Sequence, residues 1–218
     1  MALGNENQTN GKLYILKLKA KDKAAKQVPS FFEVSEKVEG KWTATSEVKR
    51  VAGNLTRITI EKGEWEGSEY DIVKLILTDP EKDESYLLDL RMNLLARSLY
   101  NSLLSLTSFE DLSISLYQTK KDDKTYDAIS LRQGDSLVKW KHDLQNQPRV
   151  ETVKIGGKKI VDSSKLDVFY IEQLTELAGI VKSAPRSAKK PTTASTDQIS
   201  QEEIAQAPTQ EISDEDVF

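Results

Sequence analysis

The sequence contains no cysteine and only one histidine in its 218 residues. The missing cysteines exclude disulfide bonds and thiolate nucleophiles, and zinc sites built from Cys and His are excluded with them. No window approaches the ~18 consecutive apolar residues that span a bilayer, and the first residues lack the basic start and apolar run of a secretory signal. We therefore expect a cytoplasmic protein whose fold depends on packing alone.

Charge is unevenly divided along the chain, which carries 31 Lys and Arg against 35 Asp and Glu. Residues 191–218 contain seven acids and no Lys or Arg, so residues 1–190 carry a net charge of +3. A slightly basic body followed by an acidic tail is compatible with binding a polyanion, although the whole chain has a net charge of -4.

Alternation of apolar and polar residues predicts strands over most of the first 161 residues. In 55–62, Ile58 and Ile60 point to one side and Arg57 to the other. Gly53 and Asn54 are expected to interrupt the chain before this strand, because glycine and asparagine favour turns. The predicted strands cover residues 13–19, 31–38, 42–51, 55–62, 70–78, 86–91, 112–116, 125–132, 137–141 and two runs within 150–161.

Two segments change to a helical period. Asn93 caps a helix predicted at residues 94–106, in which leucines recur every three to four positions. Ser164 is the expected N-cap of a closing helix that ends near Lys182, with its inward stripe formed by Asp167, Ile171, Leu174, Ala178 and Val181.

A hairpin and a tail complete the organisation. Gly156 and Gly157 indicate a two-residue turn within a hairpin at 150–161, which either mediates self-association or closes the edge of a barrel. Residues 183–213 are polar and almost without aromatics, so we expect a disordered linker. The last five residues, 214–218, restore both charge and hydrophobicity.

This layout predicts a mainly β domain over residues 1–182. The expected architecture is an OB-like five-stranded, partly closed barrel with additional strands, one internal helix and one C-terminal helix. Together with the tail, the chain resembles the single-stranded DNA-binding proteins of bacteria, and more closely the single-domain versions encoded by bacteriophages. That resemblance implies a role in DNA replication, recombination or repair, in the cytoplasm of a bacterial host.

The resemblance also implies that the tail tip docks into replication, recombination or repair proteins. Three acids would attract a basic rim on the partner, and a terminal aromatic ring would anchor the contact. An acidic tail that only aids solubility is the alternative, but solubility requires no exposed Phe. The matching residues are Asp214, Glu215, Asp216, Val217 and Phe218.

Binding of single strands without sequence preference requires cations interleaved with aromatic rings on one solvent face. By alternation, Tyr117, Tyr126 and Arg132 share the face opposite Leu116 and Ile129. The alternative for each outward Tyr is ordinary cross-strand packing, and Trp42 and Trp140 are expected to pack in the core or at an edge. The candidates are Arg57, Trp65, Tyr70, Lys74, Tyr117, Lys120, Lys121, Tyr126 and Arg132.

Catalysis has little support, because His142 has no recognisable carboxylate or nucleophile partner in sequence. We expect no enzyme activity, no cofactor, no metal and no membrane contact. The alternative function is a β-rich interaction adaptor or virion-associated protein that does not bind nucleic acid. A weaker alternative, an inhibitor that imitates DNA phosphates, is disfavoured by the sparse acids of the tail.

Overall fold

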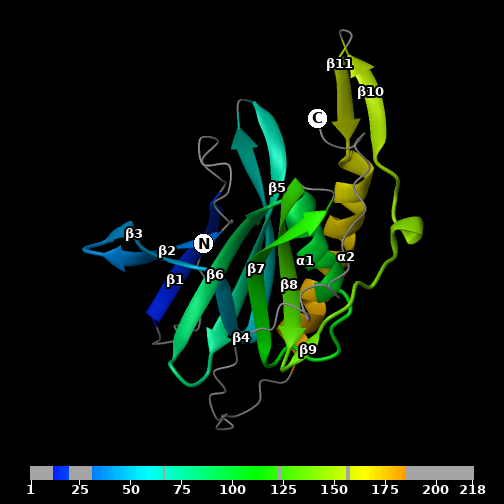
Figure 1. The fold of residues 1–218 in the computed structure, drawn as a ribbon. Helices are drawn as coiled ribbons and strands as arrows, with labels where there is room; N and C mark the ends of the chain where they lie inside the picture. Colours follow the sequence, from blue (N-terminus) through cyan, green and yellow to red (C-terminus); the bar gives the residue numbers. More distant parts are fainter. Residues whose placement is uncertain (1–11, 20–30, 66, 122–123, 156–157, 185–218) are drawn as a thin grey trace, which may run out of the picture.

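A computed structural model describes residues 12–19, 31–65, 67–121, 124–155 and 158–184 (Figure 1). These residues form a large sheet, a separate two-stranded hairpin, and two helices that lie on one side of the sheet (Figure 1). The mainly β character predicted from the alternation of the sequence is confirmed.

Nine strands form the main sheet, in the order β3-β2-β1-β6-β5-β4-β7-β8-β9. Neighbouring strands are antiparallel except for β1 and β6, which are parallel. The strands are β1 (Lys12–Lys19), β2 (Phe31–Val38), β3 (Lys41–Val48), β4 (Arg50–Trp65), β5 (Ser68–Asp79), β6 (Glu84–Arg91), β7 (Leu112–Lys121), β8 (Lys124–Gln133) and β9 (Ser136–Leu137).

The sheet does not close into a barrel, which corrects the sequence prediction. Its two ends in the described residues are β3 and β9, and these strands do not pair with each other. Strand β1 occupies the edge of β6 that would otherwise be available for closure, since the parallel register joins Lys12–Lys17 of β1 to Glu84–Asp89 of β6.

Strand β4 joins the two halves of the sheet, and this too differs from the prediction. Its first residues, from Arg50 to Gly53, pair with β7, and the rest pairs with β5. Gly53 does not end the strand. Its φ of +151° is open to glycine, and a Cβ atom there would lie 2.8 Å from the Thr78 carbonyl oxygen. The absent side chain thus permits close approach at the point where β4 changes partners.

One face of the sheet and the two helices enclose a single hydrophobic core. Valines, leucines and isoleucines alternate inward along the central strands, as the sequence predicts for Ile58, Val73, Leu75 and Leu77. Phe32, Val73, Leu75, Leu77, Leu88, Tyr100, Leu131 and Leu174 are completely buried. Burial of this apolar surface is the main stabilising contribution in a chain without disulfides.

Helix α1 (Leu94–Leu103) begins where its cap was predicted. The Asn93 side chain accepts a hydrogen bond from the Ala96 N–H at 2.8 Å, which satisfies one of the unpaired donors of the first turn. The helix ends three residues before the predicted end at Leu106, because Ser105 and Leu106 continue only as turns bonded to Ser102 and Leu103.

Helix α2 (Ser164–Ser183) runs past the predicted end of the body, so Ser183 belongs to the helix and not to the linker. Its N-cap is Ser163 in place of Ser164. In the predicted stripe Leu174 and Val181 are buried, and Ile171 and Ala178 are half-buried against the core. The other buried residues of the helix are Leu166, Tyr170 and Leu177. Asp167, the first residue of the predicted stripe, is half-buried and forms an ion pair with a residue of α1.

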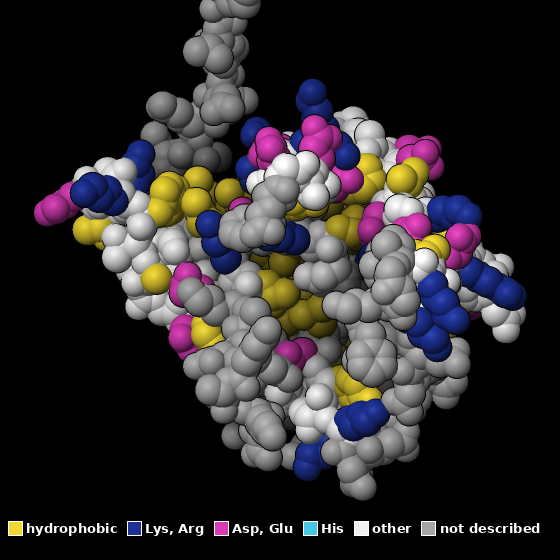
Figure 2. Space-filling model, turned by 90° about the horizontal axis from the view of Figure 1, so that it is seen from above, with side chains coloured by type: hydrophobic (Ala, Val, Ile, Leu, Met, Phe, Trp, Pro, Cys, Tyr) yellow, Lys and Arg dark blue, Asp and Glu magenta, His cyan; other side chains and the backbone are white. Residues whose placement is uncertain are grey.

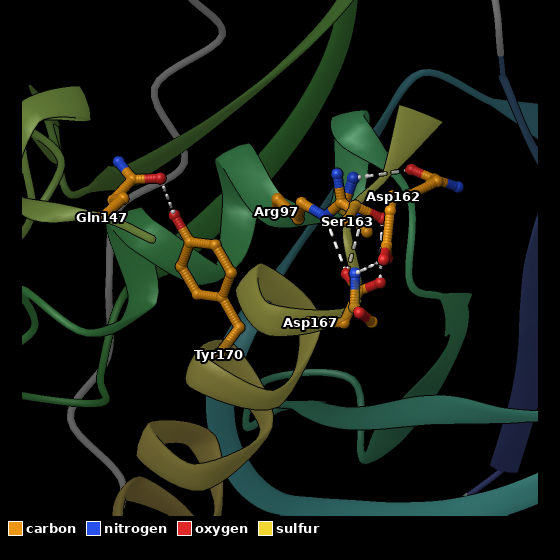
Figure 3. Close-up of polar contacts among 9 residues, drawn as sticks. Arg97, Gln147, Asp162, Ser163, Asp167 and Tyr170 are labelled. Carbon is orange, nitrogen blue, oxygen red and sulfur yellow. Dashed lines mark hydrogen bonds and ion pairs between the residues drawn. The ribbon is translucent and has the colours of Figure 1, made fainter. Parts of the chain in front are cut away.

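That partner is Arg97 of α1 (Figure 3). Its guanidinium donates to Asp167 Oδ1 from Nε at 2.9 Å and from Nη2 at 2.6 Å, and also to Ser163 Oγ at 2.5 Å. Ser163 Oγ in turn donates to Asp167 Oδ2 at 3.1 Å. These contacts fix the first turn of α2 against α1.

Two predicted segments take other forms. Residues 137–141 contribute only the end of β9, and a short 3-10 helix at Leu144–Asn146 follows. The predicted hairpin is confirmed as β10 (Glu151–Ile155) and β11 (Lys158–Asp162), although its Gly156-Gly157 turn lies outside the described residues. Self-association through this hairpin stays a prediction. The proposed linker beyond Ala184 also lies outside them.

Candidate nucleic-acid interface

The candidate residues on β4 and β5 share the sheet face that points away from the core, called the outer face below. The register pairs Arg57 with Ile76 and Thr59 with Lys74, and Tyr70 is opposite Gly63. On β6, alternate residues complete the same face, because Leu87, Asp89 and Arg91 pair with Ile76, Lys74 and Ile72. The predicted alternation therefore holds across three adjacent strands.

Tyr70 is positioned from both sides. The Arg91 guanidinium carbon lies 4.5 Å from the centre of the Tyr70 ring, within the range of a cation–π contact. A Cβ atom on Gly63 would lie 2.7 Å from the Tyr70 ring, so the glycine makes room for the aromatic side chain. The half-buried ring and the exposed Arg91 thus form an ordered pair of an aromatic surface and a cation.

The two other outer-face cations differ in their surroundings. Arg57 is exposed and follows the irregularity at Leu55–Arg57, where Thr56 is the extra residue on β4. Lys74 is half-buried and forms an ion pair with Glu61, whose carboxylate partly neutralises it. Between the cations the face is apolar, because Ile72, Ile76 and Leu87 are half-buried there.

The β7–β8 hairpin carries the second group of candidates. Tyr117 pairs with Ala128 and Tyr126 with Thr119, so both rings lie on the face opposite Leu116 and Ile129, as predicted. Arg132 is on this face too, and its guanidinium donates to the Asp135 carbonyl oxygen at 2.7 Å. Arg132 therefore holds the turn into β9, which gives it a structural role.

Lys120 is exposed near the end of β7, close to the β7–β8 turn. The backbones of Trp65 and Lys121 are in strands, opposite Ser68 and Lys124, but their side chains lie outside the described residues. The five predicted partner-binding residues, 214–218, lie outside them as well. Nothing in the structure bears on the docking prediction for the tail.

The structure does not gather all the candidates into one cluster. Tyr70 and Lys74 lie along the part of β4 that pairs with β5, while β7 pairs with the opposite end of β4 at Arg50–Gly53. Two groups result, one on β4–β6 and one on β7–β8, and the bent strand β4 connects them.

Arg91 belongs to the candidate surface and was missed in sequence, and Trp42 adds an exposed ring at the edge of the sheet, one of the two places expected for it. Alternation along 86–91 places Arg91 outward, which was the available signal. Trp42 was assigned to the core or an edge. It lies on the edge strand β3 with 44% of its surface exposed, and its partner is Lys37, on the outer-face side of β2. An exposed indole beside a lysine is a combination that stacks on bases.

The electrostatics of the surface are mixed. On the outer face, Lys74 is paired with Glu61 and lies opposite Asp89 in the register. The top of the molecule, a different surface, also shows Lys and Arg side chains beside Asp and Glu (Figure 2). Burial raises the pKa of the Tyr117 hydroxyl, so this ring stays neutral at physiological pH. A surface of this kind would bind a polyanion through individual cations and rings, not through one broad positive field.

Metal binding and membrane crossing have no candidate groups in the described ranges. No group of three or more His, Asp or Glu side chains there is arranged to hold a metal ion. No helix in the same ranges is long and apolar enough to cross a membrane. His142 contacts Gln173 through Nε2 at 2.7 Å and packs edge-on against Phe169, which are structural contacts.

Comparisons with protein-family models, curated proteins and solved structures found no match to this chain. The candidate surface therefore depends on its own geometry: an ordered Tyr70–Arg91 pair, a nearby apolar strip, and a second pair of tyrosines on the β7–β8 hairpin.

Proposed function

We propose that this protein binds and protects single-stranded DNA without strong sequence preference. The observation that supports the proposal most is the ordered pair formed by Tyr70 and Arg91 on a solvent-facing sheet. Base stacking on aromatic rings combined with backbone neutralisation by cations is how sequence-tolerant single-strand binding is achieved. Arg57 and Lys120 supply further exposed cations, and Tyr126 a further ring.

The connectivity of β4 to β8 supports the same function. Three antiparallel strands, β4, β5 and β6, precede α1, and the β7–β8 hairpin follows it. Strand β4, the first of these five, pairs with both β5 and β7. OB domains have this order and bind oligonucleotides on their second and third strands and on the loops after the first and fourth. Tyr70 and Lys74 lie on the second strand of this order, and Lys120 lies near the end of the fourth, close to the β7–β8 turn. These five strands do not close into a barrel, because β6 pairs with β1 and not with β8.

Recruitment of replication, recombination or repair proteins through Asp214–Phe218 is the second part of the proposal. It is supported by the sequence pattern alone, in which acids precede a terminal aromatic residue. A labelled peptide of residues 205–218 should bind a replication or repair protein of the host, and the same peptide with Phe218→Ala should bind at least tenfold more weakly. Equal binding by both peptides would reject an aromatic anchor.

DNA binding by residues 1–182 is tested by fluorescence anisotropy of labelled oligothymidine, with variants that change one aromatic residue at a time. Tyr126→Leu removes the aromatic ring but keeps an apolar side chain, and Tyr126→Phe keeps the ring. Stacking contributes ~1–3 kcal/mol per base, so the Leu variant should lose about that much binding free energy and the Phe variant very little. If the Tyr126→Leu variant and the corresponding Tyr70→Leu variant both bound oligothymidine with the affinity of the wild type, the stacking mechanism would be rejected.

A second candidate function is the protein-interaction adaptor, which one observation favours. Lys74 is already paired with Glu61, so part of the positive charge on this face is neutralised within the protein. An adaptor would show no binding of oligothymidine at any salt concentration, whereas the proposed function requires binding that weakens as salt is added.

A further inference from the structure

The β10–β11 hairpin stands apart from the main sheet. Its two strands pair with each other and with no other strand in the described residues. Figure 1 shows it at the top of the molecule, extending beyond the first turn of α2. An isolated two-stranded hairpin is only marginally stable in water, so this one depends on its contacts with the rest of the protein.

The base of the hairpin is neutralised and anchored. Glu151 and Asp162 face each other in the register, and each has its own partner. Glu151 forms an ion pair with Lys165 of α2, and Asp162 accepts a hydrogen bond from the Ser164 N–H at 3.0 Å. That hydrogen bond and the nearby Lys165 lower the pKa of Asp162, so the carboxyl group stays ionised. These contacts fix the hairpin to the start of α2.

Farther along the hairpin, the charged side chains that the structure describes are basic. Lys154 and Lys159 are directly opposite each other in the register, and both are exposed. Their Cβ atoms are therefore about 4.5–5.5 Å apart, a separation at which like charges destabilise a strand pair. Neither ammonium group forms an ion pair or side-chain hydrogen bond with another residue in the described part of the chain. An anion between the two lysines would remove this repulsion.

We infer that Lys154 and Lys159 bind the phosphate backbone of a DNA strand and make the hairpin a second contact arm, separate from the outer face of the sheet. The inference rests on the proposed single-strand binding. The arm carries no aromatic residue between Glu151 and Asp162, so it contributes charge and not stacking. A phosphate backbone fits the two lysines because it is a continuous polyanion.

The test is a salt titration of oligothymidine binding by the full-length protein and by the double variant Lys154→Gln/Lys159→Gln. Each lost phosphate contact lowers the slope of log affinity against log salt by about 0.7 on a single strand. The double variant should therefore lose about 1.4 in slope and bind about 25-fold more weakly at ~0.1 M salt. It should melt no lower than the wild type, because the substitutions remove a repulsion.

A matched double variant, Lys41→Gln/Lys182→Gln, changes the net charge equally at exposed positions on the β2–β3 turn and the last turn of α2. It should retain the wild-type slope and affinity. If the hairpin variant behaves like this control while the wild type binds, the contact arm is wrong and the proposed function stands. If the wild type does not bind oligothymidine, both are wrong.

Discussion

Gly53→Ala is expected to destabilise the protein more than alanine at any other described glycine with a positive φ. The added Cβ would lie 2.8 Å from the Thr78 carbonyl oxygen and 2.9 Å from its carbon, and both atoms belong to the backbone of a central strand. Crowding of this kind costs about 1–3 kcal/mol, and the φ of +151° adds about 1–3 kcal/mol for a residue with a side chain.

The expected loss in the free energy of unfolding is therefore about 2–6 kcal/mol, a large part of the ~5–15 kcal/mol that is usual for a domain. Gly40→Ala is the matched control, since Gly40 also has a positive φ, of +82°, but no atom within 4 Å of the added Cβ. It should cost only about 1–2 kcal/mol.

Urea denaturation followed by circular dichroism measures the free energy of unfolding of both variants. An unchanged slope of that free energy against urea concentration checks that unfolding stays two-state. If Gly53→Ala were no less stable than Gly40→Ala, the close approach of β4 to Thr78 would not restrict the residue at position 53, and the account of how β4 changes partners would have to change.

Three further outcomes are expected. Asp167→Ala should lower the free energy of unfolding by about 2 kcal/mol, less than the ~3–5 kcal/mol lost when one partner of a fully buried ion pair is removed. A double-mutant cycle with Arg97→Ala should show coupling, and strictly additive losses would contradict a stabilising contact between Arg97 and Asp167. Burial would raise the pKa of Asp79, but hydrogen bonds from the Glu81 and Lys82 N–H groups and the Lys82 ammonium outweigh it and lower that pKa, so Asp79 stabilises the fold above the ordinary carboxyl pKa and this stabilisation is lost as pH falls through the folded-state pKa. The destabilisation by Asp79→Asn, measured by urea denaturation, should therefore shrink at acid pH. A pH-independent difference would reject this role of the Asp79 carboxylate. Removal of residues 191–218 should strengthen oligothymidine binding at low salt and have little effect at high salt, because the acidic tail competes for cations on the body; unchanged low-salt affinity would reject the competition.

The local pattern of the sequence predicted most strands and both helices, because alternation and capping are short-range signals. Asn93 and the inward residues of β5 are examples. Gly53 was assigned to a break because its neighbour in space, Thr78, is distant in sequence. The parallel pairing of β1 with β6, which leaves the sheet open, has no local signal either.

The candidate site shows the same division. Parity correctly placed Tyr117, Tyr126, Tyr70 and Lys74 on faces opposite the core, since side-chain direction follows from strand period. The stacking of Arg91 on Tyr70 and the pairing of Lys74 with Glu61 depend on strand register, which the sequence does not specify.

The central claim is tested most directly by titrating labelled oligothymidine with the wild-type protein at low and moderate salt, with a duplex of equal length as competitor. The account predicts tight binding of the single strand that weakens with salt and is displaced poorly by the duplex. Absence of binding at low salt, or equal competition by the duplex, would contradict single-strand binding by this sheet.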